Sequence, residues 1–188
     1  KSFYKIENGK KFSYDPATKT YKALPGGDAF IVMSNYQDKL VWKNGSCKLV
    51  DLGDEVLGLQ WSTKMGSIGG DVLSGIQTAI DKAEKNYKGL VIANEGLNFS
   101  AGANVGMIFM LAIDQEYDEL DMAIRLFQNT MMRARYSSIP VVTAPHGLAL
   151  GGACELSLHS DKCCPAAETY TGLVELGVGL IPGGGGTK

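Results

Sequence analysis

Apolar positions follow an extended pattern in the first third of the chain and a helical pattern afterwards. Residues 40–42 (LVW) and 47–51 (CKLVD) flank Lys-Asn-Gly-Ser at 43–46, a sequence typical of a β-hairpin turn. Two more runs, AFIVM at 29–33 and EVLGLQW at 55–61, predict further strands. The first half of the molecule should therefore contribute several adjacent strands.

The spacing of apolar residues changes after residue 68, where Val72, Ile76, Ile80 and Ala83 recur on one face of a predicted helix over 68–83. Helical and extended patterns then alternate to the end of the chain. The pattern predicts helices at 104–113, 120–134 and 151–158, and strands at 89–93, 139–144 and near 169–170. Such alternation indicates an α/β fold with largely parallel strands, in which ligands bind where strands end and helices begin.

The polar, Lys- and Tyr-rich residues 1–27 end in Leu-Pro-Gly-Gly, which favours a linker or arm from a preceding domain. Residues 28–188 are then one domain, which a chain of 188 residues can supply with a full core. The abrupt start at Lys1 and the stop directly after a glycine-rich stretch lead us to expect a piece of a longer protein.

Composition excludes several classes of function. The net charge of −2 argues against binding to nucleic acid or to an anionic membrane, and no apolar run is long enough to span a bilayer. The two isolated histidines predict no metal site. Four cysteines without CxxC spacing indicate a reduced, cytoplasmic protein with thiols used for packing, and Cys154 and Cys163 lie in apolar surroundings.

Three segments carry candidate chemistry. Residues 98–104 (NFSAGAN) and 145–156 (PHGLALGGACEL) each place small residues where a strand gives way to a helix, which exposes backbone N–H groups to a negatively charged ligand. Small turns of this kind also occur for packing alone. Glu155 has apolar neighbours that favour a buried carboxylate, although a solvated glutamate at a helix N-terminus is the plainer alternative.

The third segment, residues 169–186, contains Glu175 among apolar and glycine residues. Its last residues, GGGGTK, do not match the phosphate loop, which requires Gly-Lys-Ser/Thr. Pro182 occupies the place of the third glycine of a dinucleotide fingerprint, so no NAD site is predicted in this chain. Ser100 and Ser157 have no histidine at the spacing of a serine hydrolase.

From about residue 55 onward, these motifs together resemble the enoyl-CoA hydratase/isomerase (crotonase) family. FSAGAN resembles the family's FxAGAD loop, GLALGGACEL its second oxyanion segment, and GLVELGVGLIPGGGGT the loop with its second catalytic acid. The resemblance implies a crotonase-like fold of repeated ββα units, with a C-terminal helical region apparently missing here. Residues 1–50 resemble the linker of bifunctional proteins in which an NAD-dependent 3-hydroxyacyl-CoA dehydrogenase precedes the hydratase.

The resemblance implies a role for seven residues. Glu155 and Glu175 would be the catalytic acid and base, and Ala103 and Gly152 would donate the two N–H groups of an oxyanion hole. The substrate-binding positions implied are Ala101, Gly151 and Gly183. The family's usual Asp after AGA is Asn104 here, which puts in doubt only the details of the coenzyme A pocket.

The implied activity is hydration of trans-2-enoyl-CoA in fatty-acid β-oxidation. Coenzyme A would be part of the substrate, and no other cofactor is expected in this chain. The alternatives are a Δ3–Δ2 enoyl-CoA isomerase, which often keeps only one of the two acids, and a non-catalytic acyl-CoA-binding or assembly module. Family members form trimers, so a homo-oligomer is possible.

Overall fold

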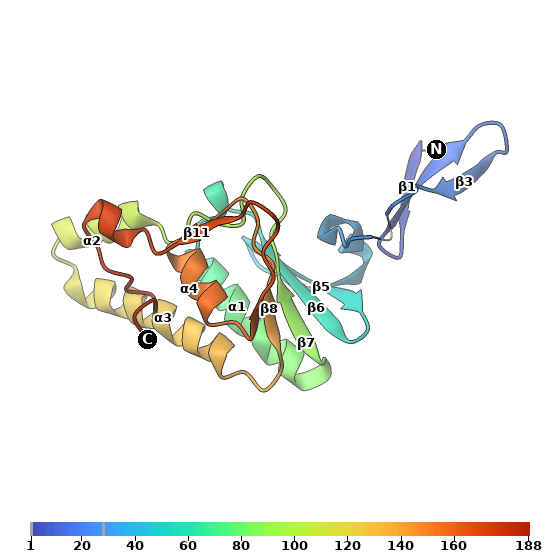
Figure 1. Ribbon diagram of the computed structural model, residues 1–188. Coiled ribbons are helices and arrows are strands. Elements are labelled where there is room, and N and C mark those ends of the chain that lie inside the picture. The colour runs from blue at the N-terminus through green and yellow to red at the C-terminus, as the bar shows by residue number, and fades with distance from the viewer. Residues whose placement is uncertain (1, 28) are drawn as a thin grey trace.

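A computed structural model describes residues 2–27 and 29–188. At the N-terminus, β1 (Tyr4–Glu7), β2 (Lys10–Asp15) and β3 (Thr20–Ala23) form an antiparallel sheet in the order β1-β2-β3. This small sheet projects from the main body, at the far end from α2 (Figure 1). The segment expected to be a linker or arm thus has regular structure of its own, while its origin in a preceding domain stays a prediction.

The strand predicted at residues 29–33 is wrong. This stretch is irregular and leads into the 3-10 helix η1 (Met33–Lys39). Phe30 and Ile31 are 66% and 57% exposed, and only Met33 of the run is buried. A strand needs a hydrogen-bonding partner, and the main sheet ends at β4, so an apolar run alone did not produce a strand here.

The main sheet has six strands in the order β10-β8-β7-β6-β5-β4. Its antiparallel half is β4 (Leu40–Lys43), β5 (Cys47–Gly53) and β6 (Val56–Trp61), which confirms the predicted hairpin. Its parallel half continues through β7 (Gly89–Ile92), β8 (Val141–Thr143) and β10 (Lys162–Cys163). The alternation of strands and helices predicted from the sequence is confirmed.

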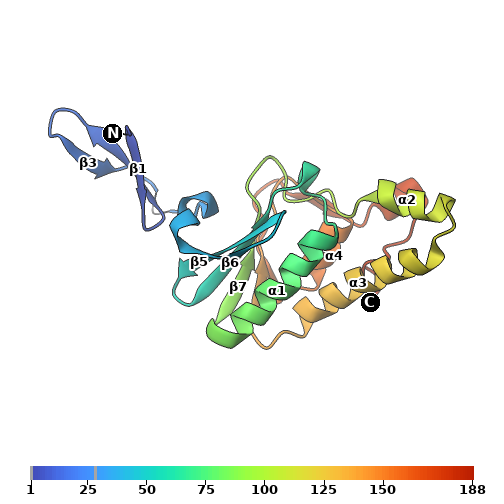
Figure 2. The ribbon, with the colours of Figure 1, turned by 180° about the vertical axis from the view of Figure 1, so that it is seen from behind.

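Four α-helices follow the predicted order: α1 (Gly70–Asn86), α2 (Val105–Ile113), α3 (Tyr117–Arg135) and α4 (Gly152–Leu158). Helix α1 packs on β5, β6 and β7 and lies beside α3 (Figure 2). Its predicted apolar face is buried, because Val72, Ile76, Ala79, Ile80 and Ala83 are all 0% exposed. The described residues also form the short 3-10 helices η2 (Lys64–Gly66) and η3 (Glu175–Val178).

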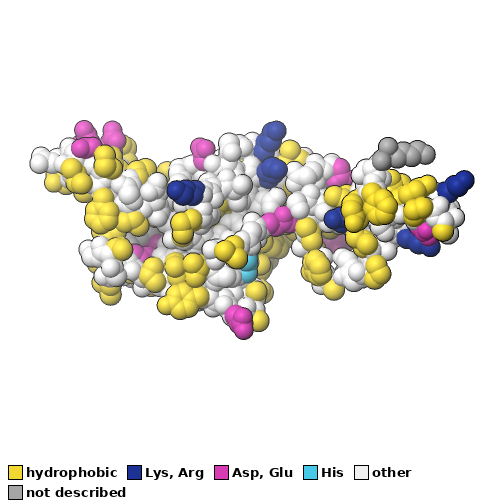
Figure 3. All heavy atoms as spheres, turned by 90° about the horizontal axis from the view of Figure 1, so that it is seen from above, with side chains coloured by type: hydrophobic (Ala, Val, Ile, Leu, Met, Phe, Trp, Pro, Cys, Tyr) yellow, Lys and Arg dark blue, Asp and Glu magenta, His cyan; other side chains and the backbone are white. Residues whose placement is uncertain are grey.

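Helix α2 differs from α1 because none of its residues is buried, although its sequence is almost entirely apolar. Met110 and Ile113 are 59% and 72% exposed. Hydrophobic side chains lie at the surface at this end of the molecule (Figure 3, left). Even so, no helix in the described part of the chain is long and apolar enough to cross a membrane.

The cysteines divide into two pairs. Cys47 and Cys154 are buried, as expected of packing residues, whereas Cys163 and Cys164 are exposed. The expectation that Cys163 packs in apolar surroundings is therefore wrong. Cys163 lies in β10, the edge strand of the main sheet, where one side of the strand has no neighbouring strand to cover it.

Candidate functional site

Three segments far apart in the sequence lie side by side under the candidate site. Strand β9 (Leu148–Leu150) pairs in parallel with β11 (Tyr170–Gly172) on one side. On its other side, β9 is bridged to Ser100, whose N–H donates to the Leu148 carbonyl over 3.0 Å and whose carbonyl accepts from the Leu150 N–H, also over 3.0 Å. Backbone hydrogen bonds therefore bring together the three segments that the sequence singled out.

The first two segments meet at Gly102. This residue has φ +89°, and a Cβ here would lie 2.5 Å from the Leu150 carbonyl oxygen and 3.0 Å from the Gly152 nitrogen. Only glycine allows such a close approach of two backbones. The Gly102 N–H is held by the buried Ser100 hydroxyl at 3.0 Å, which fixes the turn before Ala103.

Ala103 and Gly152, the two predicted oxyanion donors, thus lie on adjoining segments. Within residues 2–27 and 29–188, neither N–H donates to a backbone carbonyl of a loop or turn. Gly152 is the first residue of α4, where an N–H has no partner inside the helix. Gly152 is itself buried, and the assignment of both N–H groups to an oxyanion hole stays a prediction.

Two of the predicted substrate-binding positions, Ala101 and Gly151, have distinct surroundings. The Ala101 N–H donates to the Met65 carbonyl over 3.0 Å, which leaves that N–H engaged within the protein. Gly151 caps α4 with φ +51°, and a Cβ on it would lie 3.1 Å from the Glu175 carboxylate oxygen Oε1. The glycine therefore makes room for the Glu175 side chain beside the N-terminus of α4.

Glu155 is buried in the first turn of α4 and is 2% exposed, so the expected buried setting is confirmed. Its Oε1 accepts a 2.8 Å hydrogen bond from the Gly186 N–H. Burial raises the pKa of the Glu155 carboxyl, hydrogen bonds from the backbone of residues 184–186 oppose that rise, and the nearby Glu175 charge adds to it. Each carboxylate thus lies within electrostatic reach of the other.

Glu175, at the start of η3, is half-buried, and its Oε2 atom is buried without a hydrogen-bond partner in the described part of the chain. An unpaired buried carboxylate oxygen is uncommon in folded proteins. The lone pairs of Glu175 Oε2 are therefore not used by any of the described residues.

Two residues of α3 that the sequence analysis missed contact residues 183–184, in the glycine-rich stretch beside Glu155. Gln128 donates from Nε2 to the Gly183 carbonyl over 2.7 Å. The Phe127 ring lies between Gly152 and Gly184, since a Cβ on either glycine would approach the ring within 2.6 Å. Their helical periodicity marked α3 as a packing element, and nothing in the sequence indicated that these two side chains contact residues 183–184.

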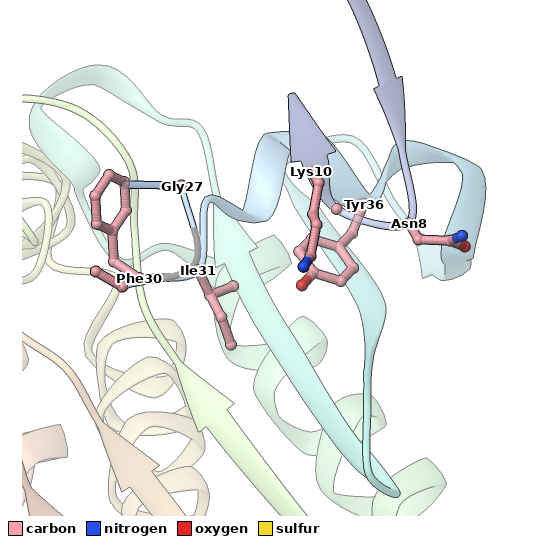
Figure 4. A pocket seen from close by; sticks show the side chains of 8 residues that line it. Asn8, Lys10, Gly27, Phe30, Ile31 and Tyr36 are labelled. Carbon is pink, nitrogen blue, oxygen red and sulfur yellow. The ribbon is translucent and has the colours of Figure 1, made fainter. Parts of the chain in front are cut away.

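Two hollows of the surface lie away from these residues. One, of about 240 Å³, lies where the N-terminal sheet meets the main body (Figure 4), lined by Asn8, Gly9, Lys10, Gly27, Ala29, Phe30, Ile31 and Tyr36. The other, of about 290 Å³, is polar and lies between α1 and α3, lined by Gln77, Asp81, Asn129 and Arg133. Neither of these two hollows is lined by a residue of the candidate site.

The chain is similar to known proteins over most of its length. The model of the family described as "Enoyl-CoA hydratase/isomerase" matches residues 56–188. A Bacillus subtilis protein named "Probable 3-hydroxyacyl-CoA dehydrogenase" is 44% identical over 189 residues, 100% of this chain and 24% of its own. A Rickettsia felis protein described as a fatty acid oxidation complex trifunctional enzyme is 39% identical over 150 residues, 80% of this chain and 21% of its own.

A solved structure has the same fold. The Thermobifida fusca protein described as an enoyl-CoA hydratase, in complex with acetoacetyl-CoA, matches with a TM-score of 0.65 at 22% identity. The match covers 76% of this chain and 59% of that one. The chain therefore spans about a quarter of the two sequence relatives and somewhat more than half of the structural neighbour.

Proposed function

Because the chain belongs to the enoyl-CoA hydratase/isomerase family, we propose that its candidate site adds water across the double bond of a trans-2-enoyl-CoA. The observation that carries the proposal is the convergence of two carboxylates on one helix N-terminus. Glu155 lies in the first turn of α4, and Glu175 lies against Gly151, the residue that caps the same helix.

In this proposal, the backbone N–H groups of Ala103 and Gly152 donate hydrogen bonds to the thioester oxygen. As water oxygen bonds to C3 of the enoyl group, negative charge moves to the thioester oxygen. Two donors aimed at that oxygen lower the barrier by about 3 kcal/mol each. The close backbone packing at Gly102 holds the two donor segments together before substrate arrives.

The two glutamates move the protons. One carboxylate accepts a proton from the attacking water, and the other carboxyl delivers a proton to C2, so the reaction consumes one water and needs no redox cofactor. The raised pKa of Glu155 suits proton transfer near neutral pH, because efficient acid–base catalysts have pKa values close to the working pH. Since the carboxylates interact, they titrate as a pair.

The wider role follows from the relatives. Their names combine a dehydrogenase with fatty acid oxidation, and we infer that this chain supplies the hydration step of β-oxidation beside an NAD-dependent dehydrogenase. Acyl-CoA is the proposed partner, in keeping with the acetoacetyl-CoA complex of the Thermobifida fusca protein. Coenzyme A enters as part of the substrate.

The test is loss of the conjugated enoyl-thioester absorbance with short- and long-chain trans-2-enoyl-CoA. It compares the wild-type chain, a version extended at the C-terminus, and Glu155→Gln and Glu175→Gln in each. We expect either substitution to lower kcat by about 10²–10⁴-fold. The matched control is Glu119→Gln, an exposed glutamate in the first turn of α3, which should leave kcat unchanged.

The outcomes separate the alternatives. A kcat for hydration that is unchanged in both Glu155→Gln and Glu175→Gln contradicts the two-glutamate mechanism. Shift of a double bond from Δ3 to Δ2, without hydration, favours the isomerase. Acyl-CoA binding without turnover in either length of chain favours a binding or assembly module.

A further inference from the structure

His159 is a buried histidine for which neither the sequence pattern nor the proposed reaction gives a role. It follows the last residue of α4 and is 3% exposed. Its Nδ1 lies 2.8 Å from the Glu155 carbonyl oxygen, one helical turn earlier. A carbonyl oxygen only accepts hydrogen bonds, so Nδ1 carries the proton and a neutral ring has its lone pair on Nε2.

The Nε2 atom of His159 is buried and has no hydrogen-bond partner within the described residues. A buried polar atom without a partner costs free energy, and an apolar side chain of similar shape would avoid that cost. Each such atom in a folded protein needs an explanation. The ring packs against the loop that also contacts the Glu155 carboxylate.

The ring edge faces the glycine-rich loop, which we define as residues 183–186. A Cβ at Gly185 would lie 3.0 Å from His159 Cε1 and 3.3 Å from Nε2. The N–H of Gly186, which follows Gly185, donates to Glu155 Oε1. Gly184, which precedes Gly185, lies against Glu155 Oε2. His159 and Glu155, four residues apart on α4, therefore hold the same short loop.

We propose that His159 is a positioning residue that braces the glycine-rich loop and thereby aims the loop N–H groups at the Glu155 carboxylate. The neutral ring donates through Nδ1 to its own helix and presents Nε2 to the loop. The expected effect of His159 on catalysis rests on the proposed acid–base role of Glu155. The expected effect of His159 on the loop and on the Glu155 pKa does not.

Other residues also hold the loop, and His159 acts beside them. Gln128 donates to the Gly183 carbonyl, and the Lys188 N–H donates to the Gly185 carbonyl over 3.0 Å. Helix α3 presents Phe127 at Gly184 and Met131 at Gly185, which are both uncharged. Glu175 is the ionisable side chain whose charge acts on the Glu155 carboxyl, and the Lys188 ammonium donates to Gln128 Oε1. Loosening the loop would weaken the N–H contacts that stabilise the charged form of Glu155.

The test uses two variants of His159 that differ in side-chain length. His159→Asn keeps an amide donor near the Glu155 carbonyl but places nothing where Nε2 contacts the loop. His159→Gln extends an amide to that place. His146→Gln is the control, because His146 bonds to the Gly96 carbonyl and not to the glycine-rich loop.

The readout is the pKa of Glu155 from carboxyl-¹³C NMR, with its signal assigned by its absence in Glu155→Gln. We expect His159→Asn to raise that pKa by about one unit, His159→Gln to restore most of the wild-type value, and His146→Gln to leave it unchanged. In turnover, His159→Asn should lower kcat about tenfold with KM nearly constant, and move the Glu155 limb of the pH profile upward. A folded His159→Asn with an unchanged Glu155 pKa would overturn the proposal.

A second measurement needs no variant. Imidazole ¹⁵N shifts of the wild-type protein should show a proton on Nδ1 of His159, and a ring protonated only on Nε2 would contradict the proposal. Neither NMR readout depends on turnover. If the glutamate variants retain hydratase activity while the His159 shifts behave as expected, the proposed function fails and the positioning role stands.

Discussion

The N–H of Gly186 donates a 2.8 Å hydrogen bond to Glu155, joining two residues that are 31 positions apart. The contact places a backbone dipole against the most buried carboxylate of the candidate site. It lowers the free-energy cost of charge at a position where burial would otherwise favour the protonated form. The glycine-rich loop thereby becomes part of the electrostatics of the site.

The first prediction concerns how Glu155 affects stability at different pH values. Burial raises its folded-state pKa above the ordinary value of about 4.3, so the folded protein holds this proton more tightly than the unfolded chain. The resulting stabilisation is complete below the unfolded pKa and is lost as pH rises through the folded pKa. Glu155→Gln should therefore match wild type near pH 4 and exceed it by about 1 kcal/mol at pH 8.

Urea unfolding of wild type, Glu155→Gln and the exposed control Glu119→Gln at the two pH values checks this prediction. A variant that is less stable than wild type at pH 8 would show that the Gly186 hydrogen bond outweighs the cost of burying the charge.

The second prediction concerns the close packing at Gly102. Gly102→Ala adds a Cβ in contact with the Leu150 carbonyl and strains a residue with φ +89°. Gly53→Ala is a matched control, because Gly53 has φ +91° and open space around its Cα. Both changes cost about 1 kcal/mol for the left-handed backbone, and Gly102→Ala should cost about 2 kcal/mol more.

Thermal unfolding and turnover together check the Gly102 prediction. Hydratase activity should fall steeply in Gly102→Ala, because the Ala103 and Gly152 donors move apart, and should persist in Gly53→Ala. Equal losses of stability in both variants would mean that the backbones at Gly102 separate without cost.

The third prediction concerns the thiols. Burial raises the pKa of Cys47 to about 12, and Cys154 is buried as well, whereas Cys163 and Cys164 are exposed. Because the thiolate is the reactive form, the native protein at pH 8 should react rapidly at the exposed Cys163 and Cys164. It should react slowly at the two buried thiols. Titration with a chromogenic disulfide, before and after unfolding in urea, measures both classes. The Cys163→Ser, Cys164→Ser double variant should lack the fast class.

The fourth prediction concerns the ion pair that joins α1 to α3. Arg133 contacts Glu84 and Asp81, and its hydrogen bond lowers the Glu84 pKa to about 2. A carboxyl with a lowered folded pKa stabilises the protein above its unfolded pKa, and this stabilisation is lost as pH falls toward 2. Arg133→Gln should cost about 1 kcal/mol at pH 7 and less at pH 3, since the pair is only partly shielded from solvent.

Unfolding in urea at both pH values measures the Arg133 effect. Arg125→Gln is the control, because Arg125 pairs with Asp121 on the exposed face of the same helix. A pH-independent loss in Arg133→Gln would assign the effect to packing of the arginine stem.

Much of the architecture was predictable because it depends on local periodicity. The apolar stripe of α1 and the Lys-Asn-Gly-Ser turn of the β4–β5 hairpin are properties of neighbouring residues, and both appear as expected. The run at 29–33 shows the limit of this reasoning. Its composition favoured a strand, but whether an apolar run becomes a strand depends on a partner that the run itself cannot specify.

The sequence by itself determined the chemical groups of the site: two glutamates, two glycine-bearing helix starts and the glycine-rich loop. Only the tertiary structure decided that Gly102 packs on Gly152, that Phe127 and Gln128 hold the loop, and that His159 meets it with an unpaired nitrogen. Those contacts join positions with large sequence separation. Their energies depend on distance and burial in three dimensions, which no local pattern of residues encodes.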